Sequence, residues 1–181
     1  ADLRAAEGLL HSILTRVLHD HTLMVSIRFG YINLYYRGGS ILKLTQQPGR
    51  GYKAEFDRGY ADDRDRLPDL PKTIRSSHDA EIWVDRLQEL KGIMDRRLAS
   101  HPKPEREFQQ ILASENNVSR LSNATEYFIT DIEFADSDYG LRFDLLALQW
   151  LAQDRRSTDR FRPVMLEMKY GDDALRGRAG I

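Results

Sequence analysis

The sequence predicts an α/β chain of the α+β kind, with a mixed central sheet flanked by helices. Three observations lead to this prediction. Apolar side chains recur at helical spacing in three separate stretches. Between them lie runs of β-branched and aromatic residues, punctuated by glycine and polar turns. With 181 residues, of which 41% are hydrophobic and 30% are charged, the chain is long enough to bury a core of its own.

Residues 1–60 are expected to form an N-terminal helix followed by an antiparallel β-hairpin and meander. The helix should run from about Leu3 to about Asp20, where apolar residues repeat every three or four positions. The β-branched and aromatic run from Leu23 to Tyr36 predicts a strand. Gly38-Gly39 then supplies the positive φ that a tight turn requires, and two further strands are expected between residues 40 and 56.

Residues 61–103 are expected to form a loop and a connecting helix. Charged residues and two prolines predict a surface loop over roughly 59–78. The helix should span about Asp79 to Leu98, with one apolar inner face. That face comprises Ile82, Trp83, Leu87, Leu90 and Met94.

Residues 104–181 are expected to form the functional core. Pro104 suits the first position of a helix that runs from Glu105 to about Glu115. Its apolar side chains, Phe108, Ile111 and Leu112, are expected to be buried. Strands are then expected at 125–135, 141–150 and 164–170, in the order helix, strand, strand, strand.

Composition excludes several classes of protein. No apolar run is long enough to cross a membrane, and no secretory signal is visible, so we expect a cytoplasmic protein without a membrane partner. The absence of cysteine excludes disulfides and thiolate metal sites. The net charge is −1, yet residues 1–60 carry eight basic against five acidic residues, and residues 140–181 carry eight against six. This distribution permits a phosphate-binding face but does not require one.

The candidate site lies in two runs that are apolar enough to form buried strands. Asp144 has apolar neighbours on both sides, and Glu167 and Lys169 lie two residues apart, on one face of the last strand. Buried strands seldom tolerate such groups without a partner or a metal ion. Hydrolysis of a phosphodiester needs Mg²⁺ or Mn²⁺ held by hard oxygen ligands. Asp144, Glu167 and the Met168 carbonyl are candidate metal ligands, and Lys169 is expected to orient the attacking water or to stabilise charge on the phosphoryl oxygens.

A fourth catalytic group is expected from the helix that precedes the sheet. Glu105 and Glu107 both lie in its first turn. At 100° per residue, Glu105 lies closer than Glu107 to the apolar stripe of that helix, so Glu105 is the preferred candidate.

The segment from Glu105 to Gly171 resembles the PD-(D/E)XK, or restriction-endonuclease-like, nuclease superfamily, in which a Glu-bearing helix precedes strands carrying Asp and then Glu-x-Lys. Pro104 to Phe108 is similar to the Glu-Arg-Glu-Leu opening of archaeal Holliday-junction resolvases of this fold. Phe143-Asp144 stands where the family has Pro-Asp or Val-Asp, and Leu166 to Lys169 matches its hydrophobic-Glu-x-Lys element.

The resemblance implies a restriction-endonuclease-like core and an Mg²⁺- or Mn²⁺-dependent endonuclease acting on nucleic acid, with DNA preferred over RNA. It covers about the last third of the chain. The family core continues with a helix and a strand after Glu-x-Lys, so we expect it to be completed beyond Ile181, by the N-terminal hairpin, or by a second subunit of a homodimer. The superfamily also contains members without activity.

Alternative interpretations stay open at this point. One alternative is a catalytically silent nuclease-fold module that binds nucleic acid or a protein and keeps the candidate catalytic residues. Another is an unrelated α+β domain in which the spacing of these residues is a coincidence. Asp131 and Glu133 share a strand face as candidate extra ligands, although a solvated outer face explains them better. The series Arg28, Tyr31, Asn33, Tyr35 and Arg37 suits base stacking or phosphate contacts, and an ordinary amphipathic strand explains it equally well.

Overall fold

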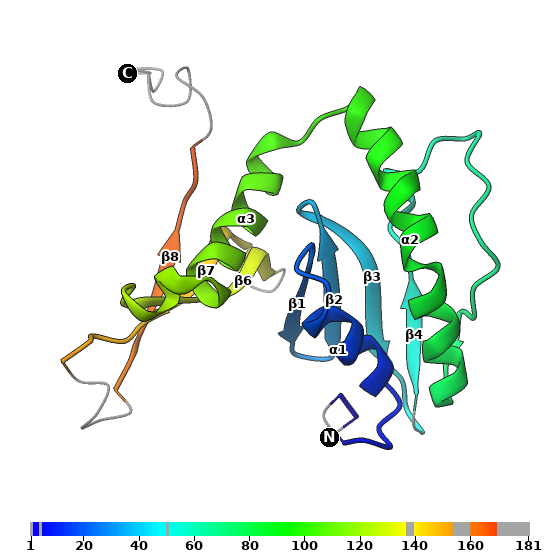
Figure 1. The fold of residues 1–181 in the computed structure, drawn as a ribbon, viewed down its shortest axis with the longest axis horizontal. Coiled ribbons are helices and arrows are strands. Elements are labelled where there is room, and N and C mark those ends of the chain that lie inside the picture. The colour runs from blue at the N-terminus through cyan, green and yellow to red at the C-terminus, as the bar shows by residue number, and fades with distance from the viewer. Residues whose placement is uncertain (1, 4, 50, 137–139, 154–159, 170–181) are drawn as a thin grey trace. The chain divides into compact units, whose positions relative to one another are not determined.

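The computed structural model describes residues 2–3, 5–49, 51–136, 140–153 and 160–169. Within them the protein has mixed α+β architecture, with three α-helices and two antiparallel sheets of five and three strands (Figure 1). The chain divides into two compact units, Ala1–Pro102 and Lys103–Ile181, and we describe each by itself. The segment expected at 1–60 and all but the last residue of the segment expected at 61–103 lie in the first unit. The mixed central sheet is not formed by the described residues, because every strand pair among them is antiparallel.

The first unit is built on a five-stranded antiparallel meander in the order β1-β2-β3-β4-β5. The strand expected over Leu23–Tyr36 is wrong in one respect, because the chain reverses at Gly30, which has φ +79°. Gly38, at φ +72°, makes the expected turn into the next strand. The strands are β1 (Leu23–Arg28), β2 (Tyr31–Tyr36), β3 (Gly39–Gln46), β4 (Tyr52–Glu55) and β5 (Thr73–Ile74).

Two helices cover this sheet and share its core. Helix α1 (His11–Leu18) starts later than expected, because the residues before it form turns. Helix α2 (Ser77–Ser100) matches its prediction and begins with a capping box between Ser76 and Asp79. A short 3₁₀ helix, η1 (Arg58–Tyr60), lies in the connecting segment. The shared core includes Leu10, Ile13, Leu34, Leu42, Leu44, Trp83, Leu87, Leu90 and Met94.

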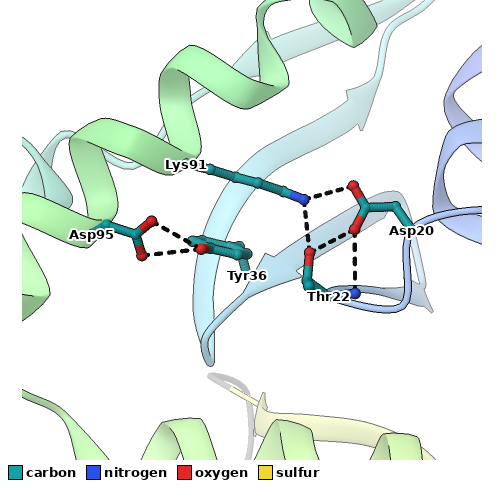
Figure 2. Close-up of polar contacts among 5 residues, drawn as sticks. All are labelled: Asp20, Thr22, Tyr36, Lys91 and Asp95. Carbon is teal, nitrogen blue, oxygen red and sulfur yellow. Dashed lines mark hydrogen bonds and ion pairs between the residues drawn. The ribbon is translucent and has the colours of Figure 1, made fainter.

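A buried polar cluster ties α2 to the sheet (Figure 2). The side chain of Lys91 is only 7% exposed, and its Nζ lies 2.6 Å from Asp20 Oδ2 and 2.7 Å from Thr22 Oγ1. The same ammonium lies 5.1 Å from the centre of the Tyr36 ring. Tyr36 donates to Asp95 at 3.0 Å, and burial together with this carboxylate raises the pKa of Tyr36 to about 12. Every charged group of the cluster thus has a partner of opposite charge or a hydrogen bond.

The second unit places one helix beside a three-stranded antiparallel sheet in the order β6-β7-β8. Helix α3 (Pro104–Val118) has Pro104 in its first turn, as expected, and ends before the 3₁₀ helix η2 (Arg120–Asn123). The strands are β6 (Tyr127–Asp136), β7 (Leu141–Gln149) and β8 (Arg162–Leu166). Strand β8 ends at Leu166, earlier than expected, and Tyr170 lies outside the described residues.

The face that α3 buries differs from the predicted one. Phe108, Ile111 and Leu112 are 47%, 49% and 43% exposed, and the buried residues of the helix are instead Gln109, Gln110 and Ala113. The physical reason is the backbone of β6, an end strand that needs hydrogen-bond partners. The Asn117 amide accepts from Ile129 N at 2.9 Å and donates to Ile129 O at 2.6 Å. Satisfying this edge turns the amide-bearing face of α3 toward the strand.

Among the described residues, no helix combines the length and the apolar character that crossing a bilayer would require.

Candidate functional site

The structure brings Asp144 next to the segment that follows β8. Strands β7 and β8 pair with Leu145 opposite Leu166, and one further step in this register sets Asp144 opposite Glu167. The Met168 backbone N–H donates to Asp144 Oδ2 at 2.7 Å. This bond orients the half-buried Asp144 carboxylate and holds the end of β8 against β7.

Glu167 and Lys169 form an ion pair at this point. The Lys169 ammonium donates to Glu167 Oε1 at 2.5 Å. This hydrogen bond and the charge of Lys169 lower the pKa of Glu167, and a hydrogen bond shared with the Asp144 carboxyl lowers it further. Because Asp144 and Glu167 stand opposite each other in the register of β7 and β8, their side chains lie on the same face at this end of the sheet. The hydrogen bond to Glu167 likewise raises the pKa of Lys169, helped by the negative charges of Glu167 and Asp144.

Glu105 lies within electrostatic reach of the same lysine. It occupies the first turn of α3, where its side chain is exposed, and its negative charge contributes to raising the pKa of Lys169. Asp144, Glu167 and Lys169 thus come together where β7 and the segment after β8 lie side by side, and Glu105 of α3 acts on Lys169 through its charge.

The premise that this site lies on buried strands is wrong. The side chains of Glu167 and Lys169 are 58% and 50% exposed. Strand β8 is an end strand of the described sheet, so one of its sides faces solvent. Exposure means that Glu167 is tolerated here without a metal ion. The argument for a metal site therefore rests on the convergence of the side chains and not on their burial.

The donor set fits Mg²⁺ or Mn²⁺ in its chemistry, although it is small. Asp144 and Glu167 supply carboxylate oxygens from opposite positions of the strand register, and the Met168 N–H, a donor and not a metal ligand, binds Asp144 Oδ2. Mg²⁺ commonly binds one or two carboxylates and completes its octahedron with water and substrate phosphate. No group of three or more acidic, histidine or cysteine side chains is arranged to hold a metal ion within the described part of the chain. A cation here also competes with Lys169 for Glu167 Oε1.

A second charged cluster in this unit was not predicted. Glu133, whose side chain is 15% exposed, lies 2.8 Å from Arg142 and 3.1 Å from Arg106. Asp131 is 5% exposed, and its Oδ1 accepts from the Ile132 N–H at 2.9 Å. The solvated outer face expected for these two acids is therefore wrong. A β-bulge between Ile129 and Asp131, which the strand pattern does not reveal, breaks the simple alternation.

The tyrosine and arginine series of the first unit forms an internal network. Arg28 donates to the Tyr31 hydroxyl at 2.7 Å and to the Tyr35 hydroxyl at 3.0 Å, and Asn33 donates to Tyr35 at 3.0 Å. Arg37 instead pairs with Asp95 at 2.9 Å. Because these groups hold one another, the series needs no ligand to explain it.

No protein-family model matches this chain, and comparison with curated proteins and with solved structures likewise gives no match. The functional argument therefore rests on the geometry around Asp144, Glu167 and Lys169.

Proposed function

We propose that this protein is an Mg²⁺-dependent nuclease that hydrolyses nucleic-acid phosphodiester bonds, and we favour DNA over RNA as the nucleic acid that it binds. One observation carries the proposal: Asp144 stands opposite Glu167 in the strand register, and the Lys169 ammonium lies 2.5 Å from Glu167 Oε1. Two hard oxygen donors beside one cation suit a phosphodiester and its metal ion better than they suit a neutral substrate.

Each residue has a distinct role in this proposal. Asp144 and Glu167 hold the metal ion, with the Met168 carbonyl as a further ligand, and the Met168 N–H fixes the orientation of Asp144. When bound, Mg²⁺ or Mn²⁺ neutralises phosphate charge and lowers the pKa of a water molecule. The raised pKa of Lys169 keeps it protonated at neutral pH, so it acts as a cation and hydrogen-bond donor and not as a base. Glu105 assists from α3, directly or through water.

A cleavage assay tests this proposal. Purified protein is incubated with single- and double-stranded DNA and RNA in Mg²⁺, in Mn²⁺ and in EDTA. We expect metal-dependent cleavage that Asp144→Asn and Lys169→Met abolish. Glu115→Gln, which removes an exposed carboxylate elsewhere in the same unit, is the matched control and should cleave normally. Cleavage that Asp144→Asn leaves unchanged would refute the assignment of Asp144 as a metal ligand.

A second candidate function is a nuclease-fold module that binds nucleic acid or a protein without cutting. The small donor set and the engagement of Glu167 by Lys169 favour it. It predicts that nucleic acid is bound and stays intact in both Mg²⁺ and Mn²⁺, whereas the nuclease proposal predicts product in at least one of them.

A further inference from the structure

The first unit contains an open groove of about 940 Å³ that the candidate site does not use. Strands β2, β3 and β4 form one side of it, and residues 56–72 form much of the other. Asn33, Lys43 and Glu55 lie opposite one another on the three adjacent strands, so they share one face of the sheet. This volume is near the upper end of the range for small-molecule sites, which leaves room for more than one nucleotide.

Positive charge predominates in this groove. Its lining has five basic residues, Lys43, Lys53, Arg58, Arg66 and Lys72, against three acidic ones, Glu55, Asp57 and Asp69. Lys53 Nζ lies 2.7 Å from Glu55 Oε1, so these two charges pair inside the groove, whereas Asp57 keeps its charge while it accepts from the Gly59 N–H at 2.9 Å.

Among the described residues, three of the basic side chains that line the groove have no acidic partner. Arg58, Arg66 and Lys72 are exposed and make no ion pair within the described part of the chain. Within the described part of the chain, Lys43 contacts the Tyr31 ring, 4.6 Å from its centre. With Lys53 paired to Glu55, four basic residues remain against Asp57 and Asp69, so the lining keeps a net charge of +2, which suits a polyanion.

The groove also has an apolar part that is held in place. Phe56, Leu67 and Leu70 are partly buried and pack against the core of the unit, and they contribute to the lining. Trp83 Nε1 donates to Pro71 O at 2.9 Å, which anchors the end of the 56–72 segment to α2. A lining that combines apolar and basic side chains matches the two parts of a nucleotide, its base and its phosphate.

We propose that this groove binds a single-stranded segment of nucleic acid, with phosphates on Arg58, Arg66 and Lys72 and bases against the apolar part. A peptide of acidic residues alone, such as polyglutamate, would satisfy the charges but would leave the apolar lining without a partner. A duplex would keep its bases stacked and out of reach. The choice of nucleic acid over another polyanion rests on the proposed function, since that function supplies such a strand as substrate.

Binding is measured by fluorescence anisotropy with a labelled twelve-nucleotide oligothymidylate and the full chain in EDTA, where no metal-dependent cleavage occurs. The triple variant Arg58→Gln, Arg66→Gln, Lys72→Gln is compared with a control triple variant. The control removes three exposed arginines that do not line the groove: Arg75, Arg86 and Arg120.

Three phosphate contacts on a single strand contribute a slope of about 2 in log K against log salt, which corresponds to about a 100-fold loss of affinity at 0.1 M salt. We expect this loss in the groove variant and an unchanged slope in the control. Equal binding by both variants, no binding by the wild type, or equal competition by polyglutamate of matched charge would each overturn the proposal. Because the assay is run without metal, strand binding without any later cleavage would count against the nuclease proposal alone, and cleavage without strand binding would count against the groove alone.

Discussion

Lys91→Met tests the claim that the buried polar cluster in Figure 2 holds α2 to the sheet. Methionine preserves the apolar stem but removes the ammonium, which lies 2.6 Å from Asp20 and 2.7 Å from Thr22. Removing one partner of a buried ion pair commonly costs about 3–5 kcal/mol. Asp20 keeps 18% exposure and its hydrogen bond from the Thr22 hydroxyl, so we expect the low end, about 3 kcal/mol.

Denaturant unfolding of the first unit provides the measurement. Trp83 is 2% exposed in that unit, and a Trp150→Phe background leaves it as the only tryptophan of the chain. Arg86→Met is the control on the same helix, because Arg86 makes only a surface contact with Glu89 at 3.6 Å, and it should change stability by less than about 0.5 kcal/mol.

A double-mutant cycle with Asp20→Asn isolates the interaction itself. The two changes should be clearly less than additive, because each single variant already breaks the same pair. A loss below about 1 kcal/mol for Lys91→Met, or additive effects in the cycle, would refute the reasoning.

Three further predictions concern stability. Burial alone would raise the pKa of Asp20, but hydrogen bonds from Lys91 and Thr22 hold it below its ordinary value. The contribution of Asp20 to stability should therefore be complete above about pH 4 and be lost as the pH falls through the lower folded-state pKa. Asp20→Asn should remove this part of the pH dependence of the unfolding free energy. Both polar atoms of the Gln109 side chain are buried without a hydrogen-bond partner among the described residues. Gln109→Met should therefore raise the unfolding free energy by about 1–2 kcal/mol, whereas Gln110→Met should lower it, because Gln110 has a partner. Destabilisation by Gln109→Met would contradict this account of α3. Asn117→Ala should cost about 1–3 kcal/mol and speed amide exchange at Ile129, because it leaves both backbone groups of Ile129 unpaired, and unchanged exchange at this amide would contradict that role.

Local signals explain why several elements were predictable. Ser76 and Asp79 form a capping box, and Pro104 occupies the first turn of its helix, so the starts of α2 and α3 follow from short motifs. The turn at Gly38 was equally local. The reversal at Gly30 was missed because a single glycine inside a β-branched run does not distinguish a turn from a bulge.

Features that depend on distant partners were not predictable. The prediction that α3 buries its apolar stripe assumed that apolar packing determines which face of the helix is buried. Instead, the backbone groups of Ile129 on the edge of β6 need hydrogen-bond partners, and Asn117 on another face of α3 supplies them. Lys91 and Asp20 are 71 residues apart, so nothing in the local pattern of either indicates the pair.

The candidate site combines both kinds of information. Spacing alone placed Asp144 and Glu167 on adjacent strands, and the register of β7 and β8 sets them opposite each other. Spacing did not reveal that β8 is an exposed end strand or that Lys169 binds Glu167 directly. Exposure follows from which strands flank β8, and that is a property of the whole sheet and not of the motif.

Calorimetric titration of the protein with Mg²⁺ tests the central claim most directly. The account predicts one site that Asp144→Asn weakens at least about tenfold and that Glu115→Gln leaves unchanged. It also predicts that Lys169→Met tightens Mg²⁺ binding, because the ammonium no longer competes for Glu167 Oε1. Absence of Mg²⁺ binding, or equal affinity in the wild type and Asp144→Asn, would contradict the assignment of a metal site to these carboxylates.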